Sequence, residues 1–352
     1  MNWKTVSCWL LVGFMLTAVL TGCGGNSAKK PAAGVLRAAY GAEPETLDPR
    51  KAIGVPEAFV MHQLFEGLVA LNIKNEYIPG VAERWETSAD GLKWTFYLRP
   101  DAKWSNGDPV TARDFEYSWK SVLSPQLASR YAAQLYVLKN GEAFNKGKAE
   151  ADQVGVKARN DNILEVTLEY PVPYFLSLVS FFTYYPVHKP TVEANEKWHA
   201  DPKTIVGNGP FKMVSWVHNS KIELAPSEHY WNKGVVKLTK LELALGDSTK
   251  TLIDMFENNQ LDDVESPPPL NDWERLRQEN KMKTFPDGSV YHYMFNVTKP
   301  PFDNVKIRKA FALSVDRQLI LSTLLKGGGV MPAYAWAPYG YPDARPGEDF
   351  RK

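Results

Sequence analysis

Side chains that commonly carry catalysis are present in this sequence, but their spacing does not support a catalytic site. The sequence has neither the G-x-S-x-G turn of an activated serine nor the G-x-x-x-x-G-K-[ST] loop that binds phosphate. The glycine-rich segments 207–211 (GNGPF) and 326–330 (KGGGV) lack the partners of such a loop, and we interpret them as turns and a helix stop. The six histidines lie far apart: His62, His188, His199, His218, His229 and His292. We therefore predict no catalytic residue, no metal site and no cofactor.

Cys23 indicates covalent chemistry of another kind. Residues 1–22 have the layout of an export signal, with Lys4 followed by an apolar run over 6–20 that is too short to span a bilayer. The segment LTGC (20–23) resembles the bacterial lipobox, in which cleavage precedes the cysteine and a lipid is attached to its sulfur. An ordinary signal peptide with an incidental cysteine is the alternative. Because an unpaired thiol is a liability in an oxidising compartment, we predict lipidation of Cys23.

The second cysteine, Cys8, lies inside the predicted signal, so the mature chain has no partner for a disulfide. Residues 23–34, rich in Gly, Ala, Ser, Lys and Pro, are predicted to form the lipid attachment point and a flexible tether. We expect a lipoprotein on the extracytoplasmic face of the cell membrane, either periplasmic or at the cell surface.

The overall charge is balanced, with 41 basic and 40 acidic side chains in 352 residues. A protein that binds nucleic acid would show a basic surface, so we predict no nucleic-acid partner. Hydrophobic residues make up 44% of the chain and aromatic residues 12%, which is enough for two or more domains with cores of their own. Tyr and Trp suit a ligand cleft, because they combine an apolar face with a polar group, but they are also common in cores.

Hydrophobic periodicity predicts strands and helices that are mixed without strict alternation. The clearest helix follows Thr111, a predicted N-cap, with Asp114 three residues later and an apolar stripe through Phe115, Trp119 and Val122. Other predicted helices cover 55–68, 248–257 and 303–326, and predicted strands cover 35–40, 68–73, 95–99, 164–168 and 241–245. The mixture indicates an α/β or α+β architecture in several lobes.

Several short motifs follow one another in an order that is more informative than any one of them. They are PETLDP (44–49), LFEGLV (64–69), a tryptophan-containing segment over 79–120, GNGPF (207–211), HYW (229–231) and PFDNVKIRKAFALSVDR (301–317). Together they resemble extracellular solute-binding protein family 5, the capture subunits of peptide-type ABC importers, and especially its oligopeptide-binding members. The resemblance extends from residue 35 to the end of the sequence.

This resemblance implies an α/β, periplasmic-binding-protein-like fold of type II, in which two lobes close around a ligand by a hinge motion. Residues 35–65 and 191–288 would form lobe I, residues 66–190 an additional subdomain of that lobe, and residues 289–352 the start of lobe II. Members of the family continue well past this point, so we expect a C-terminally truncated second lobe. We also expect weak or no peptide binding by these residues alone, and exposed apolar surface where the lobes would meet.

The resemblance further implies that an extended peptide is held through its main chain. The implied contacts are Val55 through its backbone, Tyr131, Glu265, Ser266, Tyr291 and Tyr293. Packing alone is the alternative for Tyr131, and also for the two later tyrosines, which would share one face of a strand. Ile53 and Ser289 depart from the pattern, because they stand where related proteins have an acidic residue and a cysteine.

The sequence thus predicts a lipid-anchored receptor that performs no catalysis. It would capture oligopeptides and deliver them to the permease and ATPase subunits of an ABC importer. Two alternatives stay open. The same fold could bind another cargo, such as a dipeptide, a metal chelate, an oligosaccharide or a signalling peptide. A cell-envelope hydrolase would need catalytic groups that converge from distant positions.

Overall fold

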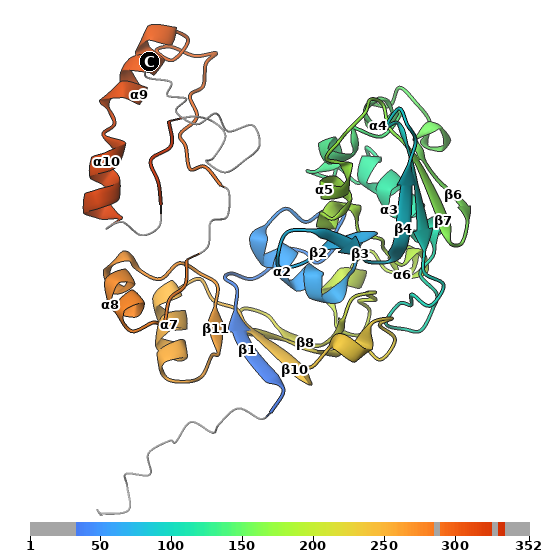
Figure 1. The fold of residues 1–352 in the computed structure, drawn as a ribbon, viewed down its shortest axis with the longest axis horizontal. Helices are drawn as coiled ribbons and strands as arrows, with labels where there is room; N and C mark the ends of the chain where they lie inside the picture. Colours follow the sequence, from blue (N-terminus) through green and yellow to red (C-terminus); the bar gives the residue numbers. More distant parts are fainter. Residues whose placement is uncertain (1–32, 285–288, 326–329, 335–352) are drawn as a thin grey trace, which may run out of the picture. The chain divides into compact units, whose positions relative to one another are not determined.

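The computed structural model describes residues 33–284, 289–325 and 330–334. The chain divides into two compact units, Met1–Ser266 and Pro267–Lys352 (Figure 1). The predicted signal, Cys23, nearly all of the predicted tether and most of the 326–330 segment lie outside the described residues. No helix in the described part of the chain is long and apolar enough to cross a membrane.

The first unit contains a five-stranded sheet in the order β11-β1-β10-β9-β8. Its strands are β1 (Val35–Ala39), β8 (Phe211–Val217), β9 (Lys221–Pro226), β10 (Lys240–Ala244) and β11 (Asp263–Val264). Strand β1 runs parallel to both β10 and β11, whereas β8, β9 and β10 pair in antiparallel fashion. Leu241 and Leu243 of β10 are buried and alternate with partly exposed residues, as the sequence predicts.

A second, four-stranded antiparallel sheet has the order β4-β5-β7-β6. Its strands are β4 (Ala82–Thr87), β5 (Lys93–Leu98), β6 (Val156–Asn160) and β7 (Ile163–Thr167), and a separate hairpin joins β2 (Val69–Leu71) to β3 (Tyr77–Pro79). Trp94, Phe96 and Leu98 alternate with exposed or partly exposed neighbours along β5. One face of the sheet is therefore packed and the other solvated.

The helix α3 (Ala112–Leu123) contacts β6 and β7 of this sheet. Its buried face carries Phe115, Trp119 and Val122, the stripe that the sequence predicts. The Asp114 carboxylate accepts hydrogen bonds from the Thr111 backbone N–H at 2.8 Å and from the Thr111 hydroxyl at 3.0 Å. These bonds fix the first turn, so the predicted helix start is confirmed.

The helix α2 (Val55–Leu64) ends earlier than the predicted helix over 55–68. Its last carbonyl accepts a hydrogen bond from the backbone N–H of Gly209 at 2.9 Å. Two residues later the backbone N–H of Glu66 donates to Asn208 Oδ1 at 3.0 Å. The segment that contains Asn208 thus takes up the helix-end groups, and the chain continues in extended form.

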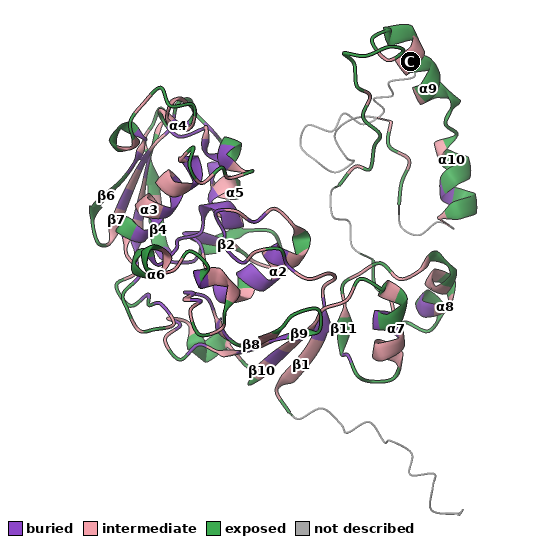
Figure 2. Ribbon diagram, turned by 180° about the vertical axis from the view of Figure 1, so that it is seen from behind, coloured by how far each residue is buried: buried purple, intermediate pink, exposed green. Residues whose placement is uncertain are grey.

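Several shorter helical segments complete the first unit. They are η1 (Ala132–Leu135), α4 (Gly141–Asn145), η2 (Ala151–Gln153), α5 (Phe175–Val179), η3 (Phe182–Tyr184), α6 (Lys189–Ala194), η4 (Trp198–Ala200), η5 (Lys233–Val235) and α7 (Thr249–Glu257). One cluster of buried apolar residues includes members of both sheets. Figure 2 shows buried residues on strands of both sheets and on the helices. Within this cluster the Trp119 indole N–H donates to the Tyr184 carbonyl at 2.7 Å, so this buried polar group is satisfied.

The second unit has little buried surface. Its described elements are η6 (Leu270–Asp272), α8 (Trp273–Gln278), α9 (Val305–Ser314), α10 (Arg317–Leu319) and η7 (Ile320–Leu324). The single helix predicted over 303–326 is wrong, because the chain is extended at Val315 and Asp316. The Asp316 carboxylate then caps a new helix by accepting from the Leu319 backbone N–H at 2.9 Å.

Candidate ligand-binding site

The predicted residues Glu265 and Ser266 lie at the carboxyl end of β11, next to the carboxyl end of β1. The Glu265 backbone N–H donates to the Ala39 carbonyl at 2.9 Å. The Ser266 hydroxyl lies 4.0 Å from the position that a Cβ would take on Gly41, whose φ is +96°. Ligands of sheet proteins commonly bind at the carboxyl ends of parallel strands, so both residues stand where a binding site is expected.

Val55 is the first residue of α2, and its side chain is 79% exposed. A backbone N–H in the first turn of a helix has no partner within that helix. Gly54 is extended and carries no side chain that could cap the helix. A Cβ at Gly54 would overlap the Glu57 carboxylate, which accepts from the Glu45 backbone N–H at 2.7 Å. The first turn therefore presents main-chain groups at the surface.

Tyr131 lies beside this turn. Its hydroxyl donates to the Ile53 carbonyl at 3.2 Å. Its ring packs against Phe181 and Phe182, with centroid distances of 5.6 Å and 6.1 Å. Tyr131 therefore does pack against the core, as the alternative interpretation holds, while its hydroxyl reaches the segment that ends at Val55.

Tyr40 and Phe59, which the sequence analysis did not identify as site residues, connect the end of β11 to α2. Tyr40 directly follows β1, and its ring stacks on Phe59 of α2. Its hydroxyl donates to Asp263 of β11 at 3.1 Å. Burial, together with the negative charge of Asp263, raises the pKa of Tyr40, and burial and the same charge also raise the pKa of Glu265. The position of Tyr40 just after a strand was the one signal in the sequence that could have identified it.

The loop between β1 and α2 is fixed at two further points. The Glu43 carboxylate accepts from the Trp216 indole N–H at 3.0 Å and from the Asn219 backbone N–H at 2.9 Å. Arg50 and Asp48 form a buried ion pair at 2.7 Å, three and five residues before Ile53. Both ends of the loop are held, so the exposed backbone near Val55 has a defined direction.

Tyr291 and Tyr293 belong to the second unit, with exposed fractions of 98% and 90%. The expectation that they share a strand is wrong, since neither lies in a strand of the described structure. Both rings are free of core packing, and their contact with a ligand stays a prediction.

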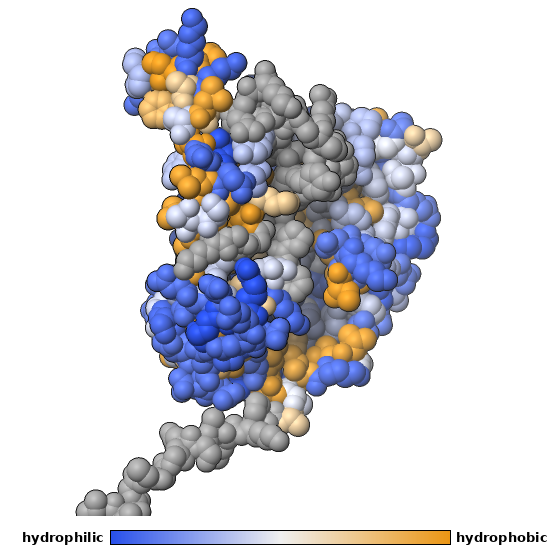
Figure 3. All heavy atoms as spheres, turned by 60° about the vertical axis from the view of Figure 1, so that its left-hand side comes forward, coloured by the Kyte–Doolittle hydropathy of each residue, from blue (hydrophilic) through white to orange (hydrophobic). Residues whose placement is uncertain are grey.

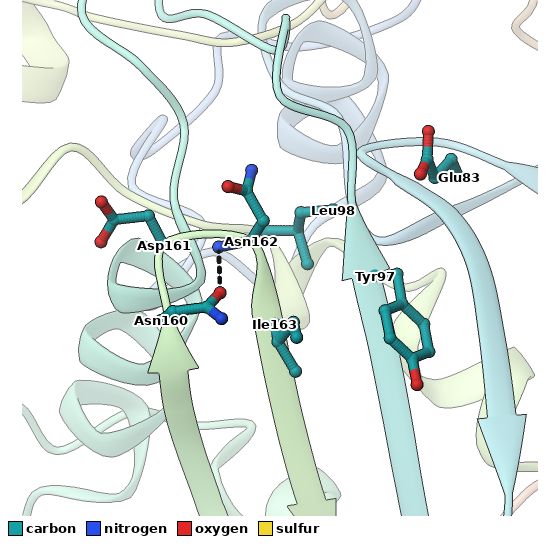
Figure 4. A pocket seen from close by; sticks show the side chains of 7 residues that line it. All are labelled: Glu83, Tyr97, Leu98, Asn160, Asp161, Asn162 and Ile163. Atoms are coloured by element: carbon teal, nitrogen blue, oxygen red, sulfur yellow. Dashed lines mark hydrogen bonds between the residues drawn. The ribbon is translucent and has the colours of Figure 1, made fainter.

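One surface depression contains none of the predicted ligand contacts. It has a volume of about 420 Å³ and lies at the turn between β6 and β7, where Asn162 donates from its backbone to Asn160 Oδ1 at 2.9 Å (Figure 4). One wall is formed by Tyr97, whose ring is covered by the Arg84 guanidinium at 3.4 Å. Asp161 pairs with Arg113 at 3.0 Å and the Tyr97 hydroxyl donates to Glu86 at 3.2 Å, so these lining groups are already engaged and the depression is a poor candidate for the ligand site.

Five of the six histidines have ordinary polar partners in the described structure. His62 Nδ1 hydrogen-bonds to the Tyr185 hydroxyl at 2.8 Å, and His188 lies between Thr191 and Asp108 at 2.7 Å and 3.0 Å. Within the described ranges, no three His, Cys, Asp or Glu residues lie close enough together to hold a metal ion.

Residues 76–352 match the family described as bacterial extracellular solute-binding proteins, family 5. The chain belongs to this family. It is 40% identical over 344 residues to the oligopeptide-binding protein OppA of Bacillus subtilis, covering 94% of this chain and 63% of that protein. It is also 40% identical over 312 residues to the dipeptide-binding protein DppE of the same organism, covering 88% of this chain and 56% of the relative.

Among solved structures of the family, the murein tripeptide binding protein MppA of Escherichia coli is similar, with a TM-score of 0.83 and 36% identity. The match covers 88% of this chain and 61% of MppA. The predicted family is thus confirmed, and the fold is the mixed α/β, two-lobed type II fold of the periplasmic peptide-binding proteins. The chain spans 56–63% of the length of these relatives.

Proposed function

We propose that this chain contributes the first wall of an extracytoplasmic cleft that captures oligopeptides for an ABC importer. The observation that carries the proposal is a series of contacts at the carboxyl ends of β1 and β11. It runs from Glu265 and Ser266, through the stacked rings of Tyr40 and Phe59, to the start of α2. The named relatives bind peptides of different lengths, which supports peptides as the class of cargo.

Main-chain recognition explains how such a surface would work. An extended peptide offers one donor and one acceptor at every residue, whatever its side chains are. The N–H of Val55 has no helical partner, and the carboxyl ends of the strands supply further backbone groups. Tyr131 would add an aromatic face next to the peptide. Binding through these groups depends little on peptide sequence, and water-filled pockets would accommodate the side chains.

The predicted division of the chain belongs to this proposal. Residues 35–65 and 191–288 are proposed as lobe I and residues 66–190 as its additional subdomain. Residues 289–352 would begin lobe II, from which Tyr291 and Tyr293 would reach the peptide. The permease and ATPase subunits of the importer are the proposed protein partners, and the chain would perform no chemistry on its cargo.

Lipid attachment at Cys23 is the second part of the proposal. A bilayer anchor would keep the receptor close to its permease, and several acyl chains hold a protein far more firmly than one. Replacing Cys23 with Ala is expected to release the protein from the membrane fraction into the soluble fraction. Retention of the variant on membranes would mean that another anchor operates.

The backbone of Val55 offers a test that separates main-chain from side-chain recognition. Val55→Pro deletes the N–H, and proline fits the first helical position after an extended Gly54. Val55→Ala keeps the N–H and removes an exposed side chain. In a titration of the ¹⁵N-labelled chain with trialanine, we expect amide shifts near residues 53–57 and 265–266. Val55→Pro should weaken binding about tenfold, while Val55→Ala leaves it unchanged.

Two outcomes would contradict this assignment. Equal effects of the two substitutions would remove the N–H of Val55 from the site, and shifts confined to residues 160–163 would favour the depression at the β6–β7 turn. Mass spectrometry of ligands that co-purify with the protein tests the cargo separately. Recovery of mixed peptides would support the proposal. Recovery of a single non-peptide ligand would mean that the protein has the same fold but binds another cargo.

A further inference from the structure

Three motifs that the binding surface does not use meet at one residue, Glu66. The carboxylate of Glu66, from LFEGLV, accepts from the Tyr230 hydroxyl at 2.6 Å and from the Trp231 indole N–H at 2.7 Å, both of which belong to HYW. Asn208, from GNGPF, accepts from the Glu66 backbone N–H at 3.0 Å and donates from Nδ2 to the Glu66 carbonyl at 2.9 Å. Side chain and main chain of Glu66 are thus both held.

Arg99 completes the cluster from the four-stranded sheet. It follows β5, and its guanidinium lies over the Trp231 ring, 3.4 Å from the centroid. Its Nε donates to the Gly80 carbonyl at 2.8 Å. Burial raises the pKa of Glu66, while the two donors and the positive charge of Arg99 act in the opposite direction. The cluster is therefore a charge-assisted network with a partner for each carboxylate oxygen.

The cluster lies where the chain passes between the two sheets, so it can fix one sheet relative to the other. The chain leaves the five-stranded sheet after α2 and returns to it before β8, so it crosses between the sheets near Glu66 and again near Asn208. The bonds between these residues join the two crossings to each other. Apolar packing between the sheets keeps them in contact but is not directional. Hydrogen bonds have a preferred geometry, so they can fix the orientation of one sheet relative to the other.

We propose that Glu66 is a positioning residue that fixes the orientation of the four-stranded sheet relative to the five-stranded sheet. Tyr131 lies on the four-stranded side, whereas Val55, Glu265 and Ser266 lie on the five-stranded side. Glu66 would therefore set the place of Tyr131 within the binding surface. The link to a ligand rests on the proposed function, but the fixing of the two sheets does not.

A distance measurement without any peptide tests this role. In the complete chain with Cys8 and Cys23 replaced by Ser, spin labels at Lys157→Cys and Val217→Cys report on β6 and β8, where both native side chains are exposed. We expect Glu66→Ala to broaden the distance distribution between the labels in double electron–electron resonance. Tyr230→Phe, which removes one bond and keeps the ring, should broaden it less, and Glu66→Gln should restore a narrow distribution.

Asp114→Ala is the matched control. Asp114 is also a carboxylate whose pKa is raised by burial, but its bonds to Thr111 stay on the four-stranded side. It should lower the melting temperature and leave the distribution narrow. Equal broadening in Asp114→Ala, or unchanged distributions in both Glu66→Ala and Tyr230→Phe, would overturn the proposal. Because no peptide is present, failure of peptide binding would leave this result standing.

Discussion

Residues 33–266 and the described residues from Pro267 onward both carry apolar side chains but bury them to very different extents. In the first region, apolar side chains of both sheets and of α2 and α3 form one continuous core. In the second, the described buried apolar residues are Leu276 and Leu321. Phe311, Leu313 and Leu324 are more than half exposed there, so apolar residues contribute to the surface (Figure 3).

This difference shows that a local sequence pattern can form a helix without burying the apolar side chains of that helix. The helices α9 and η7 have formed, α9 with Asn304 as its cap, but all of their apolar side chains except Leu321 stay at least partly exposed. Phe311 contacts only the rings of Phe295 and Phe302 among the described aromatic residues. Short helices in water are marginal without tertiary packing. Exposed apolar residues are present in the second unit, and their place where the lobes would meet stays a prediction.

The largest predicted effect contrasts one aromatic residue from each region. Trp119→Ala should destabilise the protein by about 3–5 kcal/mol, because it leaves a cavity in the core and deprives the Tyr184 carbonyl of its donor. Phe311→Ala removes a side chain that is 51% exposed and should change the free energy of unfolding by less than about 0.5 kcal/mol. Urea denaturation followed by far-ultraviolet circular dichroism measures both. Comparable losses would mean that Phe311 is packed in solution.

A smaller effect concerns pH and the Glu66 cluster of the first region. Because burial raises the folded-state pKa of Glu66 above 4.5, the folded protein binds more protons than the unfolded chain between 4.5 and the raised value. Stability from this group is therefore present at low pH and is lost as pH rises through that window. Glu66→Gln should remove this part of the slope. Glu66→Ala should cost about 1–3 kcal/mol, because the Tyr230 and Trp231 donors lose their acceptor.

Glu279 of the second region serves as a control, because its pKa is shifted in the opposite direction from that of Glu66. Lys281 and Arg275 lower the pKa of Glu279, which lies on the surface of α8 and its C-terminal end. Glu279→Gln should leave the pH dependence of unfolding between pH 5 and pH 7 unchanged. If Glu66→Gln left that dependence unchanged as well, the carboxylate would titrate in the folded state as it does in the unfolded chain.

Local elements were predictable because their signals are local. The strand alternation of β5, β7 and β10 and the cap of α3 each depend on residues a few positions apart, and the structure contains all of them. The end of α2 was missed because Asn208 acts on Glu66 from 142 positions away. The single helix over 303–326 was missed because an aspartate inside an apolar pattern can restart a helix as well as continue it.

The same distinction between local and long-range contacts applies to the candidate site. The family resemblance placed Val55, Tyr131, Glu265 and Ser266 in one site. In the structure Glu265 bonds to Ala39 of β1, and Tyr131 bonds to Ile53, two residues before α2. The connection through Tyr40 was not predictable, since a tyrosine after a strand shows neither its stacking partner nor its acceptor. Contacts across such long sequence separations depend on the fold as a whole.

The smallest effect compares helix caps in the two regions. Thr111→Ala deletes the hydroxyl that donates to Asp114 at the start of α3, and should cost about 1 kcal/mol of global stability, because α3 packs against the four-stranded sheet. Asn304 caps α9 through Oδ1, which accepts from the Lys306 backbone N–H at 2.9 Å. Since α9 has no buried residue, Asn304→Ala should leave the main unfolding midpoint unchanged and increase amide exchange within 305–314.

Hydrogen exchange read by mass spectrometry, together with urea denaturation, distinguishes these two outcomes. Thr111→Ala should raise exchange across α3 in proportion to the loss of global stability, because a packed helix opens with the core that it contacts. A loss of midpoint in Asn304→Ala equal to that in Thr111→Ala would show that α9 unfolds together with the core. The two regions would then be one cooperative unit, and the exposure of Phe311 and Leu313 would not reflect their environment in solution.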